Sequence, residues 1–156
     1  MATISLQEVE VVRTLHGGPP VVVNFPEAAS QTFKRGELVN LVNGKITEAG
    51  AADIYLGMAL KDASGVVDTN TQVVLATADV VFKANLTTGQ TTAQADLGKS
   101  YGLAKVSDKF HLSNGIVGAN ARALVVDHDP LDVVGDIQGR LYFVLLSRFL
   151  QFGVTS

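Results

Sequence analysis

The sequence predicts an all-β protein, and three observations lead to this prediction. Its apolar runs are short, rich in Val, Ile, Leu and Phe, and separated by clusters of Gly, Asn, Asp and Pro. No segment keeps a helical period long enough to cross over between parallel strands, so pairing should be antiparallel. Asn43-Gly44 divides one apolar run, as in a two-residue hairpin. We expect a compact antiparallel β-barrel or sandwich of about nine short strands, with little helix.

The first twenty residues are expected to form an N-terminal arm. Ile4 and Leu6 alternate with polar residues, as do Val9 and Val11, which favours an extended strand. The segment 17–20, Gly-Gly-Pro-Pro, then interrupts regular structure, because proline lacks a backbone donor. We expect residues 21–156 to form a single β-domain. The arm either reaches a neighbouring subunit, through these four apolar residues, or lies as an edge strand on its own body.

The hairpin centred on Asn43-Gly44 has 38–42 as its first strand and 45–47 as its second. Both central residues of a type I′ turn need a positive φ, which Asn and Gly adopt readily. Gly36 is expected to serve the bend before the first strand.

The other expected strands are, in chain order, 21–23, 54–60, 72–76, 80–84, 101–106, 110–112, 121–127 and 140–150. Within 54–60, Gly57 marks a bulge or a close backbone approach. Residues 93–98 predict one helical turn. The run 140–150 is the longest apolar run, and its β-branched and aromatic residues indicate a central strand.

Composition limits the classes of function. Hydrophobic residues make up 47% and charged residues 17% of the chain, which argues against disorder. The apolar excess fills a core or covers surface that a partner buries. The net charge is 12 − 15 = −3 without a basic cluster, so we expect no nucleic-acid partner. There is no cysteine for disulfides or thiolate sites. Neither a signal peptide nor a membrane span is predicted, which indicates synthesis in a cytosol-like compartment.

The sequence shows no clear metal or catalytic site. His16, His111 and His128 share no metal-ligand spacing, and His111 is expected on the outer face of a strand. Asp127–Asp132, with Asp136 nearby, gathers carboxylates around His128, but the spacing of a calcium loop is absent. A solvated turn is therefore expected there, and no metal or cofactor.

Motifs for enzymatic activity are also missing. The chain has no Gly-x-Ser-x-Gly elbow, no Gly-x-Gly-x-x-Gly and no phosphate-binding loop of the Walker type. Tyr55, Tyr101 and Tyr142 lie in strand patterns and are expected to pack in the core rather than stack on a sugar or base. We expect no enzyme, although sequence alone leaves a pair of carboxylates in a cleft open.

Several segments together resemble the capsid decoration, or cement, proteins of tailed bacteriophages. In order they are FKRGELVNLVNGKITEA, IYLGMALKDAS, VFKANL, DLGKSYGLAKV and LYFVLLSRFLQ. The landmarks are Phe33 before Gly36-Glu37-Leu38-Val39, then Gly57-Met58-Ala59-Leu60 leading to Asp62-Ala63-Ser64, and later Leu97-Gly98 before Tyr101-Gly102-Leu103. The similarity spans roughly residues 30 to 150, and the first 25 residues look more individual.

This resemblance implies a compact β-barrel, usually trimeric, on the outside of an assembled phage head. The implied partners are the major capsid protein and two further copies of the chain, at a three-fold or quasi-three-fold junction. There the protein would stabilise the capsid against the pressure of packed DNA. Two alternatives remain: a tail, fibre or receptor-binding module, and a ligand-binding barrel or trimeric hydrolase. The latter would need Asp127, His128 and Asp132 to converge in a cleft.

Overall fold

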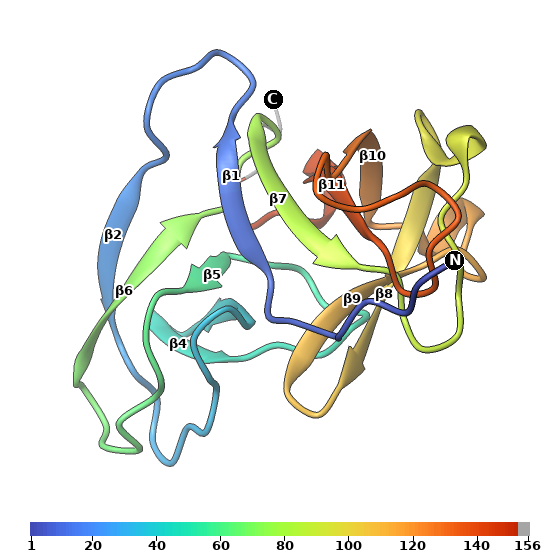
Figure 1. Ribbon diagram of the computed structural model, residues 1–156. Coiled ribbons are helices and arrows are strands. Elements are labelled where there is room, and N and C mark those ends of the chain that lie inside the picture. The colour runs from blue at the N-terminus through green and yellow to red at the C-terminus, as the bar shows by residue number, and fades with distance from the viewer. Residues whose placement is uncertain (153–156) are drawn as a thin grey trace.

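The computed structural model describes residues 1–152, and over them the chain is all-β with two antiparallel sheets, as predicted (Figure 1). The sheets contain six and five strands, so the eleven strands exceed the expected number. The arrangement is sandwich-like, and no closed barrel forms within the described part of the chain. Of the two architectures expected, the sandwich is therefore the one found, and the closed barrel implied by the family resemblance is not.

The six-stranded sheet has the order β1-β7-β11-β10-β8-β9. Its strands are β1 (Glu10–Thr14), β7 (Val80–Asn85), β11 (Arg140–Leu145), β10 (Ala123–His128), β8 (Ser100–Val106) and β9 (Lys109–Ser113). An isolated bridge between Leu86 and Leu112 brings β9 back towards the end of β7. The sheet therefore curls strongly around its inner face.

The five-stranded sheet has the order β2-β6-β5-β3-β4. Its strands are β2 (Val22–Pro26), β6 (Asn70–Leu75), β5 (Gly57–Ala59), β3 (Leu38–Val42) and β4 (Lys45–Glu48). Glu27 and Ile46 form an isolated bridge that also curls this sheet. Three single 3₁₀ turns also lie within residues 1–152, at Gln94–Asp96, Gly118–Asn120 and Ser147–Phe149.

Two glycine-dependent predictions are confirmed. The turn between β3 and β4 has φ values of 50° at Asn43 and 77° at Gly44, as a type I′ turn requires. At Gly57 the backbone of β6 lies so close that an added Cβ would stand 1.9 Å from Val74 O. Gly57 is therefore a point of close backbone approach.

Several strand boundaries differ from the predicted ones. The expected strand 54–60 is reduced to β5, with Tyr55 bridged instead to Leu150. The run 140–150 is indeed central, but its strand ends at Leu145 and the 3₁₀ turn follows. β2 continues through Pro26, which an edge strand tolerates because its outer N–H needs no partner.

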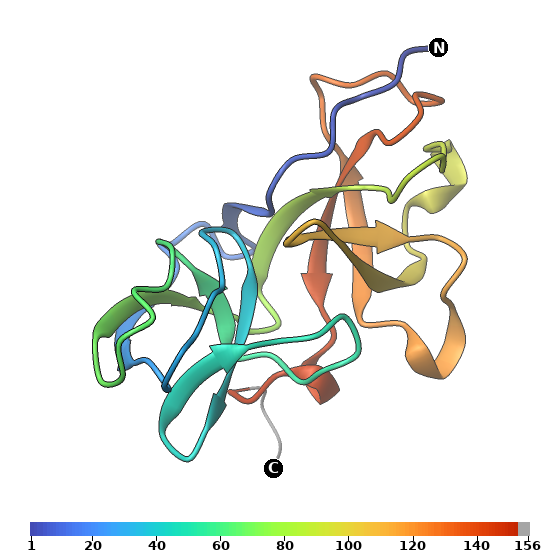
Figure 2. The same ribbon diagram turned by 90° about the horizontal axis from the view of Figure 1, so that it is seen from below.

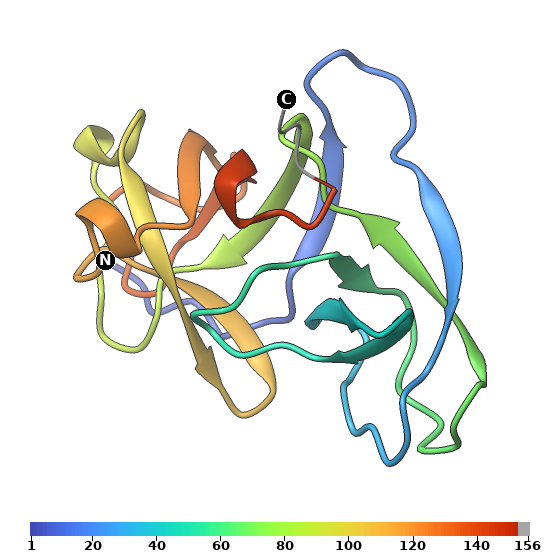
Figure 3. The same cartoon turned by 180° about the vertical axis from the view of Figure 1, so that it is seen from behind.

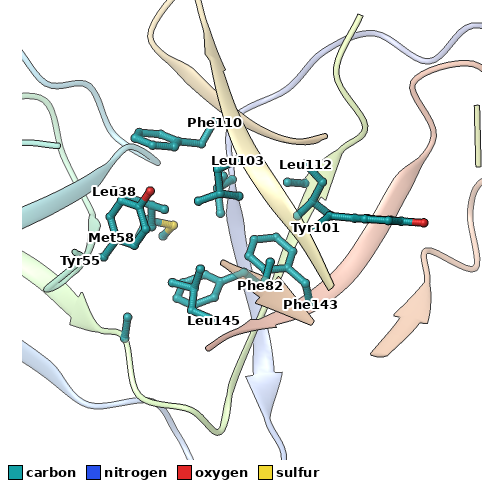
Figure 4. Packing of buried hydrophobic residues seen from close by; sticks show 14 of the residues in the cluster. Leu38, Tyr55, Met58, Phe82, Tyr101, Leu103, Phe110, Leu112, Phe143 and Leu145 are labelled. Carbon is teal, nitrogen blue, oxygen red and sulfur yellow. The ribbon is translucent and has the colours of Figure 1, made fainter. Parts of the chain in front are cut away.

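The main core lies between the two sheets and inside the curled six-stranded sheet (Figure 4). Tyr55 meets Phe110 edge-on, with ring centroids 6.1 Å apart, and Phe82 stacks on Phe143 at 5.8 Å. The expected core positions of Tyr55 and Tyr101 are confirmed, whereas Tyr142 is half-buried. A second cluster lines the five-stranded sheet and consists of Phe33, Val39, Ile46, Leu56, Ala59 and Val73.

The arm lies on its own body. β1 pairs with β7 at the edge of the six-stranded sheet, and the preceding residues run on to the loop between β10 and β11 (Figure 2). Ile4 N donates to Ile137 O at 2.8 Å, and Ile137 N donates to Ala2 O at 2.7 Å. This is the edge-strand alternative of the two considered. The structure does not test residues 1–20 and 21–156 as separate units, and residues 153–156 lie outside the described part.

Candidate interaction surface

Carboxylates fix the loop between β10 and β11. Asp129 Oδ1 accepts a hydrogen bond from Leu131 N at 3.0 Å. Asp136 accepts one from Val133 N at 3.1 Å and, through its other oxygen, one from Ala2 N at 2.9 Å. The side chains of Asp129 and Asp136 are buried, and a buried carboxylate is costly without partners. Both oxygens of Asp136 accept hydrogen bonds, whereas Asp129 Oδ2 has only the nearby charges of Arg140 Nε at 3.3 Å and Lys83 Nζ at 3.5 Å.

Arg140 holds the middle of the same loop. Its Nη2 lies 2.7 Å from Asp132 Oδ1, its Nε donates to Asp132 Oδ2 at 3.0 Å, and its backbone N donates there at 2.8 Å. Burial opposes ionisation of Asp132, but these hydrogen bonds outweigh it and lower the pKa of the carboxyl. The solvated turn predicted for this segment is therefore wrong, since Asp129, Asp132 and Asp136 form an internal framework. Sequence did not show which strand would supply the arginine.

This framework holds three apolar side chains out in solvent, which we call the 131–134 tip: Leu131, Val133 and Val134. Leu131 is 80% exposed and Val133 70% exposed. A disordered loop could expose these side chains at a lower cost in free energy, but the backbone on both sides of the 131–134 tip is held by hydrogen bonds. Ordered apolar side chains in solvent are typical of a surface that a partner covers.

A second loop, 61–69, has the same construction. Glu27, which is fully buried, accepts hydrogen bonds from Ser64 N at 3.0 Å and from Thr71 Oγ1 at 2.9 Å. Burial would raise the pKa of Glu27, but these donors lower it overall. The loop exposes Val66 and Val67, at the opposite end of the molecule from the 131–134 tip (Figure 3).

The one group of acidic side chains with metal-like spacing in residues 1–152 is Glu37, Glu48 and Asp108. Lys105 already occupies it, because its Nζ lies 2.7 Å from both Glu37 Oε1 and Glu48 Oε1. Burial alone would lower the pKa of Lys105, yet the two carboxylates raise it. The ammonium group takes the place that a cation would need, so this cluster is an ion pair between the sheets.

The histidines have three unrelated environments. His16 lies on the surface, with Nδ1 2.7 Å from Asp79 Oδ2. His128 Nε2 lies 2.9 Å from Ala93 O, and Asp127 is exposed. With Asp132 bound to Arg140, the convergence that would have favoured a hydrolase is not seen. His111 lies on the face of β9 opposite the core residues Phe110 and Leu112, as expected, but it is fully buried there.

The four predicted contact residues do not form one exposed face in this chain. Val9 is buried in the main core, and Val11 packs against that core. Ile4 and Leu6 are half-buried where the arm crosses the six-stranded sheet. Their role in subunit or capsid contact stays a prediction.

A hollow of about 380 Å³ lies between the arm and the five-stranded sheet. Val9, Val11 and Met58 form part of its lining, and Glu8 Oε1 at its edge already pairs with Arg35 Nη2 at 2.8 Å. Glu10, the second acid of the lining, lies 3.3 Å from Lys83 Nζ, so both acids of the hollow are engaged in ion pairs.

No protein-family model matches the sequence, and no curated protein matches it. Among residues 1–152 there is also no helix long and apolar enough to cross a membrane.

Proposed function

We propose that this protein is a virion structural protein that binds the outer surface of an assembled bacteriophage head. In this proposal it acts as a homotrimer at three-fold or quasi-three-fold positions of the major capsid protein. Its place is the capsid exterior, and its effect is to stabilise the head against internal DNA pressure. The family resemblance supplies the identity of the partner.

The observation that best supports a binding role is the 131–134 tip. Leu131 and Val133 are held in solvent by a loop whose carboxylates and arginine are turned inward. The internal framework fixes the loop before any partner arrives, so little conformational entropy remains to be lost on binding. A rigid apolar projection of this kind suits attachment to a large, preformed protein surface.

A trimer would strengthen such an attachment. Three linked copies would present three copies of one patch to a three-fold symmetric site. After the first copy binds, the second and third engagements become intramolecular, so modest contacts give a tight complex.

Cryo-electron microscopy of heads incubated with the purified protein tests the proposal. We expect additional density on the outer surface at three-fold positions. Density confined to a tail or fibre would favour the rival assignment as a tail component, and the absence of added density anywhere on the particle would contradict decoration.

A further inference from the structure

The strand pairing places His111 beneath the N-terminal arm. Leu86 and Leu112 form a bridge, and both belong to the main core. Successive side chains of a strand point to opposite faces, so the residues before them, Asn85 and His111, share the outer face. Both are nevertheless buried, at 1% and 0% exposure. Something must therefore cover this face.

The covering segment is the arm around Leu6. Asn85 Oδ1 accepts a hydrogen bond from Gln7 N at 2.9 Å, and Asn85 Nδ2 donates to Ser5 O at 3.1 Å. On the other side of His111 along the same face, Lys109 Nζ donates to Leu6 O at 3.3 Å. These three hydrogen bonds hold residues 5–7 of the arm to β7 and β9, and the N-terminal segment crosses this part of the six-stranded sheet (Figure 1).

The imidazole itself is unusual. Neither Nδ1 nor Nε2 of His111 has a hydrogen-bond partner among residues 1–152. Burial, assisted by the charge of Lys109, lowers the pKa of His111 to about 4. A protonated imidazole would carry two buried donors and a charge with no acceptor, so the protonated form needs water.

The charged groups around this face offer no compensation. They are Lys109 on β9, Lys83 on β7, Arg140 on β11, Glu8 and Glu10 on the arm and β1, and Asp129 after β10, which lies 3.5 Å from Lys83 Nζ and 3.3 Å from Arg140 Nε. Glu8 pairs with Arg35, Glu10 pairs with Lys83, and Arg140 pairs with Asp132. The same face of β8 carries Gly102, Ala104 and Val106, which do not ionise. Protonation of His111 can therefore be relieved only by opening the cover.

We propose that residues 1–8 form a strap that lifts from the six-stranded sheet when His111 takes up a proton. The strap is the weakest part of the cover, because residues 1–8 belong to no strand and none of them is fully buried. Lifting it hydrates the imidazole and leaves the strands in place. This inference does not depend on the proposed function.

Hydrogen exchange followed by NMR tests the strap, with the Gln7 amide as reporter. Its partner is the neutral Asn85, so its protection does not depend directly on a carboxylate. In the wild type, opening at Gln7 should increase as pH falls from about 6.5, by roughly 150-fold at pH 4, and should approach roughly 300-fold only below about pH 3. The Phe82 and Phe143 amides should keep their protection, and His111→Leu should abolish the change at Gln7.

Leu6→Ala provides a second variant that leaves the imidazole in place. Thinning the cover lets water reach His111, so the pKa measured by NMR should move up towards the ordinary value of about 6.5. Asp136 also fastens the arm, because its Oδ1 accepts a hydrogen bond from Ala2 N, and His111→Leu leaves that contact in place. The proposal is wrong if acid lowers the protection of the Gln7 amide equally in His111→Leu. It is also wrong if the Gln7 amide loses protection only together with the Phe82 and Phe143 amides. An unchanged His111 pKa in Leu6→Ala would also overturn it.

Discussion

Lys105 Nζ lies 2.7 Å from Glu37 Oε1, and this ion pair joins the two sheets. Lys105 comes from β8 of the six-stranded sheet, and Glu37 directly precedes β3 of the five-stranded sheet. Glu37 is fully buried, and burial raises its pKa despite the neighbouring lysine. The pair therefore fixes how the sheets face each other at the cost of desolvating a carboxylate.

Lys105→Met should destabilise the protein by about 3 kcal/mol at neutral pH, because Glu37 is left as an unpaired buried charge. The loss should shrink as the pH is lowered, since protonated Glu37 carries no charge. Urea unfolding measures both effects. Adding Glu37→Gln should recover much of the loss.

Lys34→Met is the matched control, because the Lys34–Asp62 pair is exposed and 3.9 Å long. It should change the unfolding free energy by less than about 1 kcal/mol. Equal losses in the two lysine variants would contradict a special role for the pair between the sheets.

Glu27→Gln should destabilise the protein by about 1–3 kcal/mol at neutral pH, because an amide cannot accept all the hydrogen bonds that the carboxylate accepts. The pKa of Glu27 is lowered by folding, so its contribution is complete above the unfolded value of 4.5 and is lost as pH falls through the folded value. The difference in unfolding free energy between the wild type and Glu27→Gln should therefore become smaller in acid. A gap that stays constant down to about pH 2 would show that ionisation of Glu27 is unimportant.

We expect that the apolar side chains of the 131–134 tip can be replaced without destabilising the fold. Leu131→Ser with Val133→Ser should leave the unfolding free energy within about 0.5 kcal/mol, since both side chains are exposed. The same double variant should bind phage heads at least tenfold more weakly, in a sedimentation titration. Val66→Ser with Val67→Ser is the matched control, because it changes two exposed valines on the loop 61–69. Full head binding by the 131 and 133 variant would exclude the tip as the contact.

A deletion that tests the contacts of the arm must be shorter than the whole arm. Removing residues 2–18 would delete β1 and the buried Val9, so misfolding would obscure any effect on binding. Removing residues 2–8 spares β1. If Ile4 and Leu6 contact a neighbouring subunit or the capsid, this deletion should lower trimer stability or head affinity. Unchanged trimer mass and unchanged affinity would disprove that contact.

The strands were predictable where local signals agree. Asn43-Gly44 predicted its hairpin, and Gly57 predicted a bulge or a close backbone approach, of which the structure has the close approach. The end of β11 at Leu145 was not predictable, since the apolar run continues through Leu150 while the chain turns into the 3₁₀ turn Ser147–Phe149.

The candidate site was harder to predict for a related reason. The cluster from Asp127 to Asp132 was evident, but a turn and an internal framework have the same composition. What separates them is Arg140, which arrives from the next strand. The burial of His111 on its outer face was not predictable, because the arm that covers it lies about a hundred residues away in the chain. Neither relationship leaves a periodic signal in the sequence.

The most direct test of the proposed function is sedimentation of the purified protein with undecorated expanded heads and with unexpanded proheads. The oligomer mass should be measured in parallel by light scattering. We predict saturable binding to expanded heads only, by a species with three times the chain mass. A monomer that binds neither form would contradict the assignment as a decoration protein.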